Sequence, residues 1–181
     1  MKHSDAVALL KGAVPRARGT WADLGCGHGV FTEALLEILG PGSRIYAVDR
    51  DRRVIEALHR RLTDSPEITP IVADFTQPDI PGLLDPFLDG ILLANSLHYA
   101  RDAEAALTRL AKRLRPGGRV ALVEYDRRAA NPWIPYPIGI SKLDRLMASA
   151  GLSKPVVIAR RPSRFTGELY VAVADLLPDN I

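Results

Sequence analysis

Three glycines alternate with other residues directly after an acidic residue. Residues 22–29 read Ala-Asp-Leu-Gly-Cys-Gly-His-Gly, and the amphipathic run 30–39 follows at once. The segment predicts a strand, then a turn with little side-chain bulk, then a helix. Such a turn lets a ligand lie against the backbone, where the helix N-terminus supplies positive potential. The pattern G-x-G-x-x-G of NAD-binding loops would need its third glycine at Val30, but the chain has it at Gly29. The segment therefore predicts a nucleotide-type loop that differs from the NAD loop.

Polar side chains also stand where later strand-like runs end. After the runs 44–48, 69–73, 88–94 and 119–123 come, in turn, Asp49, Asp74, Asn95 and Glu124. A carboxylate at the end of the second strand of a βαβ unit accepts hydrogen bonds from both hydroxyls of a ribose. Together these runs predict a parallel sheet with a ligand at the carboxyl ends of its strands.

Taken in order, these segments resemble the class I, Rossmann-like S-adenosylmethionine-dependent methyltransferases. The resemblance spans roughly residues 20–125 and rests on the segments 23–29, 46–49, 73–75, 89–98 and 114–120. It implies an α/β fold: a doubly wound, seven-stranded, mostly parallel sheet in the order 3-2-1-4-5-7-6, with strand 7 antiparallel and helices on both faces. It implies in-line transfer of a methyl group from S-adenosyl-L-methionine to an acceptor, with S-adenosyl-L-homocysteine as the product.

The resemblance also implies a cofactor site built from the glycine loop and the strand ends. Its residues are Asp23, Gly25, Cys26, Gly27, Gly29, Asp49, Arg50, Asp74, Phe75 and Asn95. In this assignment Asp23 organises the loop, which faces the methionine part of the cofactor. Asp49 binds the ribose, Arg50 lies over the adenine and Asp74 accepts from the adenine amino group. The Phe75 backbone meets a ring nitrogen, and Asn95 lines the methionine.

Several of these residues have an alternative role in the fold. Asp49 is also placed to cap a helix over 51–62, and Asp74 to begin a turn before Pro78. Phe75 is equally suited to the core. Cys26 is better explained as a small buried residue than as a nucleophile, because no base is evident beside it.

His98 is the candidate catalytic residue. It follows Asn95 by three positions, on the rim where an acceptor would arrive. A histidine there can take a proton from a hydroxyl or an amine, and packing or hydrogen bonding is the alternative. The four histidines lack the spacing of metal ligands, so no metal is predicted.

An aromatic, proline-rich segment is the candidate substrate rim. Residues 131–138 read Asn-Pro-Trp-Ile-Pro-Tyr-Pro-Ile, within a predicted loop over 126–140. Prolines stiffen this backbone, and its aromatic rings offer flat surfaces. We assign the rim to Tyr99, Tyr125, Trp133 and Tyr136. The alternative is a stiff connector whose rings pack on the core.

The remaining elements are predicted from caps, breakers and periodicity. We expect a short N-terminal helical segment (1–19) that contains a helix from Ser4 to Lys11. Two further helices are expected, one over 103–114 and one from a capping box at Ser141 to Gly151. The final strands are expected over 156–159 and 169–174, joined by a hairpin at 163–167.

Bulk composition fits one soluble domain over residues 1–181. The chain is 47% hydrophobic and 25% charged, with a net charge of +3 and one cysteine. No apolar run is long enough to cross a membrane and no signal-peptide core is present, so a cytoplasmic location is expected. A small-molecule acceptor is the first expectation. The alternatives are an RNA or protein acceptor, a non-catalytic cofactor-binding partner subunit, and a homo-oligomer that closes the site.

Overall fold

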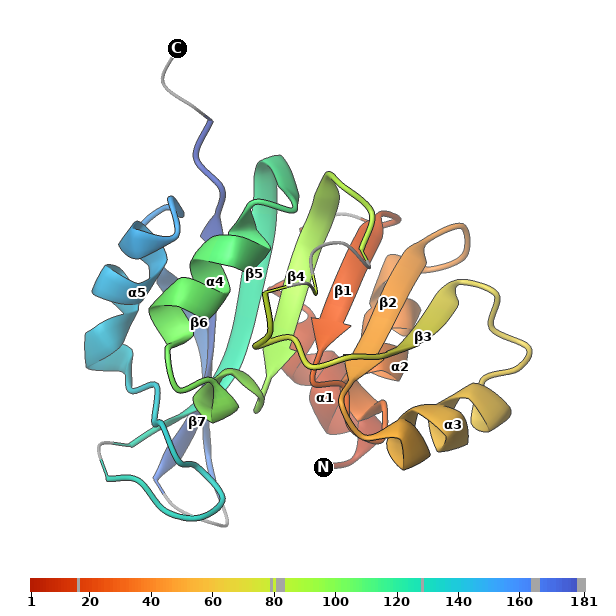
Figure 1. The fold of residues 1–181 in the computed structure, drawn as a ribbon, viewed down its shortest axis with the longest axis horizontal. Coiled ribbons are helices and arrows are strands. Elements are labelled where there is room, and N and C mark those ends of the chain that lie inside the picture. The colour runs from red at the N-terminus through yellow and green to blue at the C-terminus, as the bar shows by residue number, and fades with distance from the viewer. Residues whose placement is uncertain (16, 79, 81–83, 128, 164–166, 179–181) are drawn as a thin grey trace.

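One sheet of seven strands forms the centre of the molecule, in the order β3-β2-β1-β4-β5-β7-β6 (Figure 1). The computed structural model describes residues 1–178 except 16, 79, 81–83, 128 and 164–166. The strands are β1 (Thr20–Leu24), β2 (Arg44–Asp49), β3 (Ile68–Val72), β4 (Leu88–Ala94), β5 (Leu114–Asp126), β6 (Val156–Pro162) and β7 (Glu168–Asp175). This order confirms the predicted fold class.

Strand direction follows the connections along the chain. β1 pairs in parallel with β2 and β4, and β2–β3 and β4–β5 are also parallel pairs. β7 is antiparallel to both β5 and β6, as expected for two strands with no helix between them. Ser163 donates its backbone N–H to the Gly167 carbonyl at 3.0 Å across the β6–β7 connection. The predicted hairpin is thereby confirmed at its ends, while residues 164–166 lie outside the described part.

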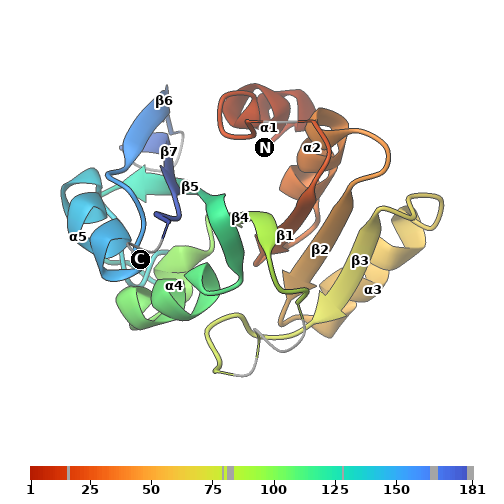
Figure 2. The same cartoon turned by 90° about the horizontal axis from the view of Figure 1, so that it is seen from above.

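Helices cover both faces of the sheet (Figure 2). They are α1 (His3–Leu10), α2 (Val30–Leu39), α3 (Arg52–Arg61), α4 (Ala103–Ala111) and α5 (Leu143–Ser149), with the short 3₁₀ helices η2 (Leu97–Tyr99) and η3 (Ile140–Lys142). Residues from α1, α2 and α3 share one buried cluster with the sheet, and residues from α4 and α5 share another. The apolar strands are therefore buried on both sides, as in other parallel sheets.

Three predicted helix boundaries were wrong. α1 begins at His3 and its N-terminus has no side-chain cap, so Ser4 does not start it. α4 ends at Ala111 instead of Leu114, because Leu114 pairs with Leu88 as the first residue of β5. The capping box at Ser141 does not form: this residue lies within η3, and α5 follows without a side-chain cap. For α4, pairing in the sheet outweighed a weak local preference for helix, and the starts of α1 and α5 differ because the predicted side-chain caps do not form.

The sheet reverses its connection order at β1, between β2 and β4. In an open α/β sheet this reversal leaves a crevice outside the carboxyl ends of the strands. The ends of β1, β2 and β4 are followed by Gly25, Arg50 and Asn95, so the fold brings these residues to one edge.

Candidate functional site

The glycine loop after β1 is tied to the neighbouring strand. The backbone N–H groups of Gly25 and Cys26 both donate to the Val48 carbonyl, at 2.8 and 3.0 Å. Gly25 has a φ of 77°, and a Cβ there would lie 2.5 Å from the Ser96 Cβ. A Cβ on Gly29 would overlap Leu58 of α3. These glycines therefore allow close packing of the loop on β4 and α3, besides leaving its backbone open.

Asp23 lies behind the loop and faces the interior. Its carboxylate is fully buried, and Oδ2 accepts a hydrogen bond of 2.6 Å from the Thr32 hydroxyl of α2. Oδ1 has no hydrogen-bond partner among the described residues. Burial raises the pKa of Asp23 to about 7; the Thr32 hydrogen bond opposes this rise, and the nearby charge of Asp49 adds to it. Burial also raises the pKa of the Cys26 thiol, which keeps it un-ionised and unsuited to nucleophilic attack.

Asp49, at the end of β2, connects the glycine loop to α3. Its Oδ2 accepts the Gly27 N–H and its Oδ1 the Asp51 N–H, each at 2.9 Å. The cap of α3 is Asp51, which accepts from Arg53 N at 2.9 Å, so the capping alternative for Asp49 is wrong. A carboxylate has about four acceptor positions, and Asp49 therefore keeps free capacity on the cavity that it lines.

A cavity of about 330 Å³ opens at these strand ends. Six of the predicted cofactor residues line it: Gly25, Asp49, Arg50, Asp74, Phe75 and Asn95. Residues that the sequence analysis did not assign to this site line it as well: Asp51, Val54, Ala73, Thr76, Ser96 and Tyr99. Thr76 and Ser96 each directly follow a predicted residue, and this adjacency was the available signal. Asp23, Cys26, Gly27 and Gly29 are not among the residues that line this cavity.

Asp74 begins a turn, which was its predicted alternative role, and it also lines the cavity at the strand ends. Its Oδ1 accepts the backbone N–H of Thr76 at 2.9 Å and the Thr76 hydroxyl at 2.7 Å. Burial opposes its ionisation, but these hydrogen bonds and the charge of Arg50 outweigh burial and hold the pKa of Asp74 below its ordinary value. Asp74 is therefore an acceptor of fixed orientation. Arg50 lies 6.0 Å from the ring centre of Tyr99, across the same cavity.

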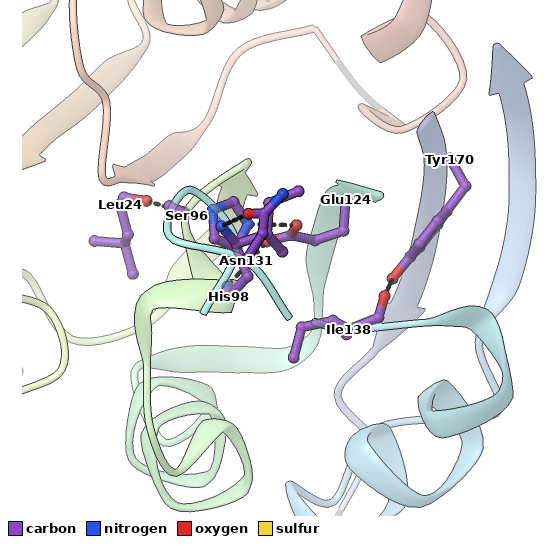
Figure 3. Close-up of polar contacts among 8 residues, drawn as sticks. Leu24, Ser96, His98, Glu124, Asn131, Ile138 and Tyr170 are labelled. Atoms are coloured by element: carbon purple, nitrogen blue, oxygen red, sulfur yellow. Dashed lines mark hydrogen bonds and ion pairs between the residues drawn. The ribbon is translucent and has the colours of Figure 1, made fainter. Parts of the chain in front are cut away.

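Asn95 occupies the end of β4 in a strained backbone conformation, with a φ of 54°. Its N–H donates to the Val123 carbonyl at 2.8 Å, and its buried Oδ1 has no partner among the described residues. The next residue, Ser96, donates its hydroxyl to the Leu24 carbonyl at 2.6 Å (Figure 3). The β4 end is thus fixed to β1 and β5, and an unsatisfied acceptor remains at its tip.

A second cavity, of about 590 Å³, lies between α1 and the β5, β6 and β7 ends. Its lining residues are Met1, Lys2, Asp5, Asn95, Tyr125, Arg161, Pro162, Ser163 and Leu169. Among the described residues, Asn95 alone lines both cavities. We call the first the strand-end cavity and the second the α1 cavity. Of the four predicted rim residues, Tyr99 lines the strand-end cavity and Tyr125 the α1 cavity, whereas Trp133 and Tyr136 are not among the residues that line either one.

His98 forms a buried pair with Glu124 of β5 (Figure 3). Its Nδ1 lies 2.7 Å from Glu124 Oε2, and its backbone N–H donates to Oε1 at 3.1 Å. Because a carboxylate only accepts, Nδ1 is the donor in this contact, and Nε2 is the ring nitrogen that Glu124 does not occupy. His98 is 2% exposed and lines neither cavity. Its ring centre is 4.4 Å from that of Tyr99, which lines the strand-end cavity.

The proline-rich segment runs past His98. The Tyr136 N–H donates to the His98 carbonyl at 3.0 Å, and Asn131 Oδ1 accepts from the Trp133 N–H at 2.9 Å. Ile138 is held from the other side, where its carbonyl accepts the Tyr170 hydroxyl at 2.7 Å (Figure 3). Trp133 is 77% exposed and Tyr136 is 41% exposed, so their rings are not core residues. The connector alternative for these two rings is thus not supported by burial.

Neither metal ligation nor membrane crossing is indicated by the described residues. They contain no cluster of three or more His, Cys, Asp or Glu side chains placed to hold an ion. None of the described helices combines the length and apolar character of a transmembrane segment.

The sheet order, the glycine loop and the strand-end cavity define a Rossmann-like domain for a nucleotide-type cofactor. The family described as "Methyltransferase domain" matches residues 22–120, more than half of the chain. The chain therefore belongs to this family, the class I S-adenosylmethionine-dependent methyltransferases.

Individual relatives agree with this family. An uncharacterized methyltransferase of Mycobacterium bovis is 30% identical over 123 residues, which cover 68% of this chain and 58% of the relative. The chain spans about half the length of the curated relatives it matches, with 44% and 58% in two cases.

Two solved structures are similar to this chain. A SAM-dependent methyltransferase from Aquifex aeolicus has a TM-score of 0.75 and 16% identity, covering 96% of this chain and 90% of that one. The Burkholderia thailandensis 1,6-didemethyltoxoflavin-N1-methyltransferase, with bound substrate and S-adenosylhomocysteine, has a TM-score of 0.72 and 23% identity, covering 97% of this chain and 78% of that one. At these identities the likeness concerns the fold.

The strand-end cavity fits the cofactor of this family, S-adenosylmethionine. Its size is within the range of about 300–1,000 Å³ common for small-molecule sites. It presents carboxylate acceptors at Asp49 and Asp74, as hydroxyl and amino donors require. The unpartnered Oδ1 of Asn95 adds an acceptor at the end that meets the α1 cavity.

Proposed function

We propose that this chain transfers the methyl group of S-adenosylmethionine to a small-molecule acceptor. One observation carries the proposal: Asn95 lines both the strand-end cavity and the α1 cavity, so we infer that a donor in one and an acceptor in the other face each other there. The Burkholderia relative of known substrate also acts on a small molecule, as its name states.

In this proposal the cofactor lies along the strand-end cavity. Asp49 accepts from the ribose hydroxyls with its free positions, Asp74 from the adenine amino group, and Arg50 lies over the adenine ring. The Phe75 backbone meets a ring nitrogen. Asn95 lines the methionine end, where its Oδ1 is unpartnered.

The glycine loop has a supporting part in this arrangement. Gly25 forms the wall of the strand-end cavity. Gly27 and Gly29 shape the loop behind it, and Cys26 fastens it to Val48 of β2. Asp23 holds the loop against α2 through Thr32.

The mechanism requires alignment more than side-chain chemistry. The bound cofactor supplies a methyl group on a sulfonium, which is an excellent leaving group. The chain holds the acceptor in line with that group at Asn95, and positioning of this kind supplies roughly 7–11 kcal/mol in favourable cases. Tyr99 and Tyr125 flank the junction and exclude water, and the exposed rings of Trp133 and Tyr136 extend the rim.

His98 is the proposed general base. Glu124 fixes its tautomer and leaves Nε2 to accept the acceptor's proton. Because the ring is buried behind Tyr99, this role requires the ring to be uncovered when the acceptor binds.

Substitution of His98 tests this role. His98→Asn should lower the single-turnover rate roughly 100-fold, the low end for general-base catalysis, and leave S-adenosylhomocysteine affinity within about twofold. Glu124→Gln should lower the rate less, because Nε2 remains in place, and should change its pH profile. The exposed His59 of α3 provides the matched control, His59→Asn. A thermal melt confirms that each variant is folded. An unchanged rate in His98→Asn would leave His98 with a packing role alone.

Calorimetric titration tests the function itself. S-adenosylmethionine and S-adenosylhomocysteine should bind with micromolar affinity, and NAD should not bind. An acceptor screen with methyl-labelled cofactor then identifies the product. Absence of binding by either sulfur compound would refute the proposal, and salt-dependent labelling of RNA would move the acceptor to the nucleic-acid class.

A further inference from the structure

We propose that the acceptor is an elongated molecule with an apolar body and an anionic end, which Lys2 and Arg161 bind at the far side of the α1 cavity. The proposal rests on the proposed function, because it names the acceptor class of the same site. The anion is a carboxylate or a phosphate.

The floor of the α1 cavity is one row of residues across neighbouring strands. Tyr125 of β5 is in register with Leu169 of β7, and Leu169 is in register with Arg161 of β6. Residues directly opposite each other in a sheet point to the same face. Asn95 directly follows β4, its N–H donates to the carbonyl of Val123, two residues before Tyr125, and it lines the same cavity. The lining therefore extends from Asn95, past the row, to an arginine.

The first residues of the chain form the opposite wall. Asp5 of α1 pairs with Arg161 at 3.0 Å and so connects α1 to β6 across the cavity. Lys2 precedes α1 and lines the same cavity. The charged side chains thus lie together at the α1–β6 side, whereas Tyr125 and Leu169 lie between them and Asn95.

The charge at this end is positive. Lys2 and Arg161 are cations and Asp5 is the carboxylate between them, which leaves one net positive charge among the charged side chains lining the cavity. The hydrogen bond from Arg161 holds the pKa of Asp5 below its ordinary value; desolvation opposes this, and the charge of Arg161 and the backbone hydrogen bond and charge of Lys2 add to the lowering. Asp5 therefore stays ionised and orients the guanidinium, whose remaining N–H groups are available to a second anion.

The row also sets the length of the acceptor. Neighbouring strands lie about 4.8 Å apart, so three strand spacings separate Asn95 from Arg161 by roughly 14 Å. The anionic group should therefore lie within roughly 14 Å of the methyl-accepting atom. The apolar wall between favours a flat or alicyclic body over a sugar.

Two fluorescent probes that differ by one anionic group provide the test. 8-Anilinonaphthalene-1-sulfonate carries a sulfonate, and N-phenyl-1-naphthylamine is its neutral counterpart. Both are titrated into the protein saturated with S-adenosylhomocysteine, which keeps the strand-end cavity filled. Arg161→Gln and Lys2→Gln should each weaken binding of the sulfonate probe roughly tenfold and leave binding of the neutral probe unchanged. Arg161→Lys keeps the charge and should retain the preference for the sulfonate.

The neighbouring Arg160 provides the matched control. It lies one residue away on β6, pairs with Glu168 at 2.8 Å and lines neither cavity, so Arg160→Gln should leave both probes unchanged. Competition by 1-naphthoate and by 1-naphthyl phosphate then shows which anion is preferred. Equal loss of both probes in Arg161→Gln, or equal competition by neutral 1-naphthol, would overturn the proposal. If S-adenosylhomocysteine binds and the probes do not discriminate, only the anion proposal fails; if it does not bind, the proposed function fails.

Discussion

Asp49→Ala is the most direct perturbation of the proposed cofactor site. The Asp49 carboxylate accepts the N–H groups of Gly27 and Asp51, each at 2.9 Å, and keeps free acceptor positions on the strand-end cavity. Alanine removes both sets of hydrogen bonds. The variant therefore strands the ribose hydroxyls and also removes the hydrogen bond that ties Gly27 of the glycine loop to β2.

The magnitude follows from the number of hydrogen bonds to the cofactor. A hydrogen bond to a charged group contributes about 1.5–3 kcal/mol, and each 1.4 kcal/mol corresponds to roughly a tenfold change in affinity. Loss of one ribose contact should weaken binding by roughly tenfold or more, and loss of both by roughly 100-fold or more. Asp49→Asn keeps one acceptor oxygen and should give an intermediate loss.

Calorimetric titration with S-adenosylhomocysteine measures the effect. Asp102→Ala is the matched control, because Asp102 accepts the Ala105 N–H at 2.9 Å as the cap of α4 and lines neither cavity. It should lower stability by about 1 kcal/mol, as the loss of a cap does, and leave affinity unchanged. An Asp49→Ala protein that is folded and binds the cofactor within about twofold of the wild type would refute the ribose assignment.

Two predictions concern the fold around the site. Gly90→Ala should lower the free energy of unfolding by about 1–3 kcal/mol, because the new methyl group would overlap the buried Trp21 ring. Gly12→Ala is the control, since its methyl group would meet only an ordinary contact of 3.4 Å. Equal melting temperatures of the two variants would contradict this packing. The raised pKa of Asp23, about 7, means that the folded state retains a proton that the unfolded state has lost, so stability should fall as pH rises from about 4 to about 7. Relative to Asp23→Asn, the wild type should lose about 2 kcal/mol between about pH 5 and about pH 7 in denaturant titrations; parallel curves would contradict the raised pKa.

The family and the strand-end residues were predictable from sequence because they depend on local features. Alternate glycines before a helix constrain the backbone within a few residues, whatever surrounds them. In a parallel sheet every strand carries its carboxyl end to the same edge, so residues that follow strands are brought together by the topology alone. Asp49, Asp74 and Asn95 lie in one cavity for this reason.

Contacts between distant segments decided the rest. The sequence offered Asp49 as the alternative cap of a helix over 51–62, whereas in the structure Asp51 caps α3 and Asp49 accepts the N–H of Gly27 from the glycine loop. The α1 cavity needs Lys2 and Arg161, residues from opposite ends of the chain, and no local pattern relates them. The burial of His98 against Glu124 likewise depends on the pairing of β4 with β5. Backbone conformation is chosen over a few residues, whereas cavities and buried pairs depend on which strands become neighbours.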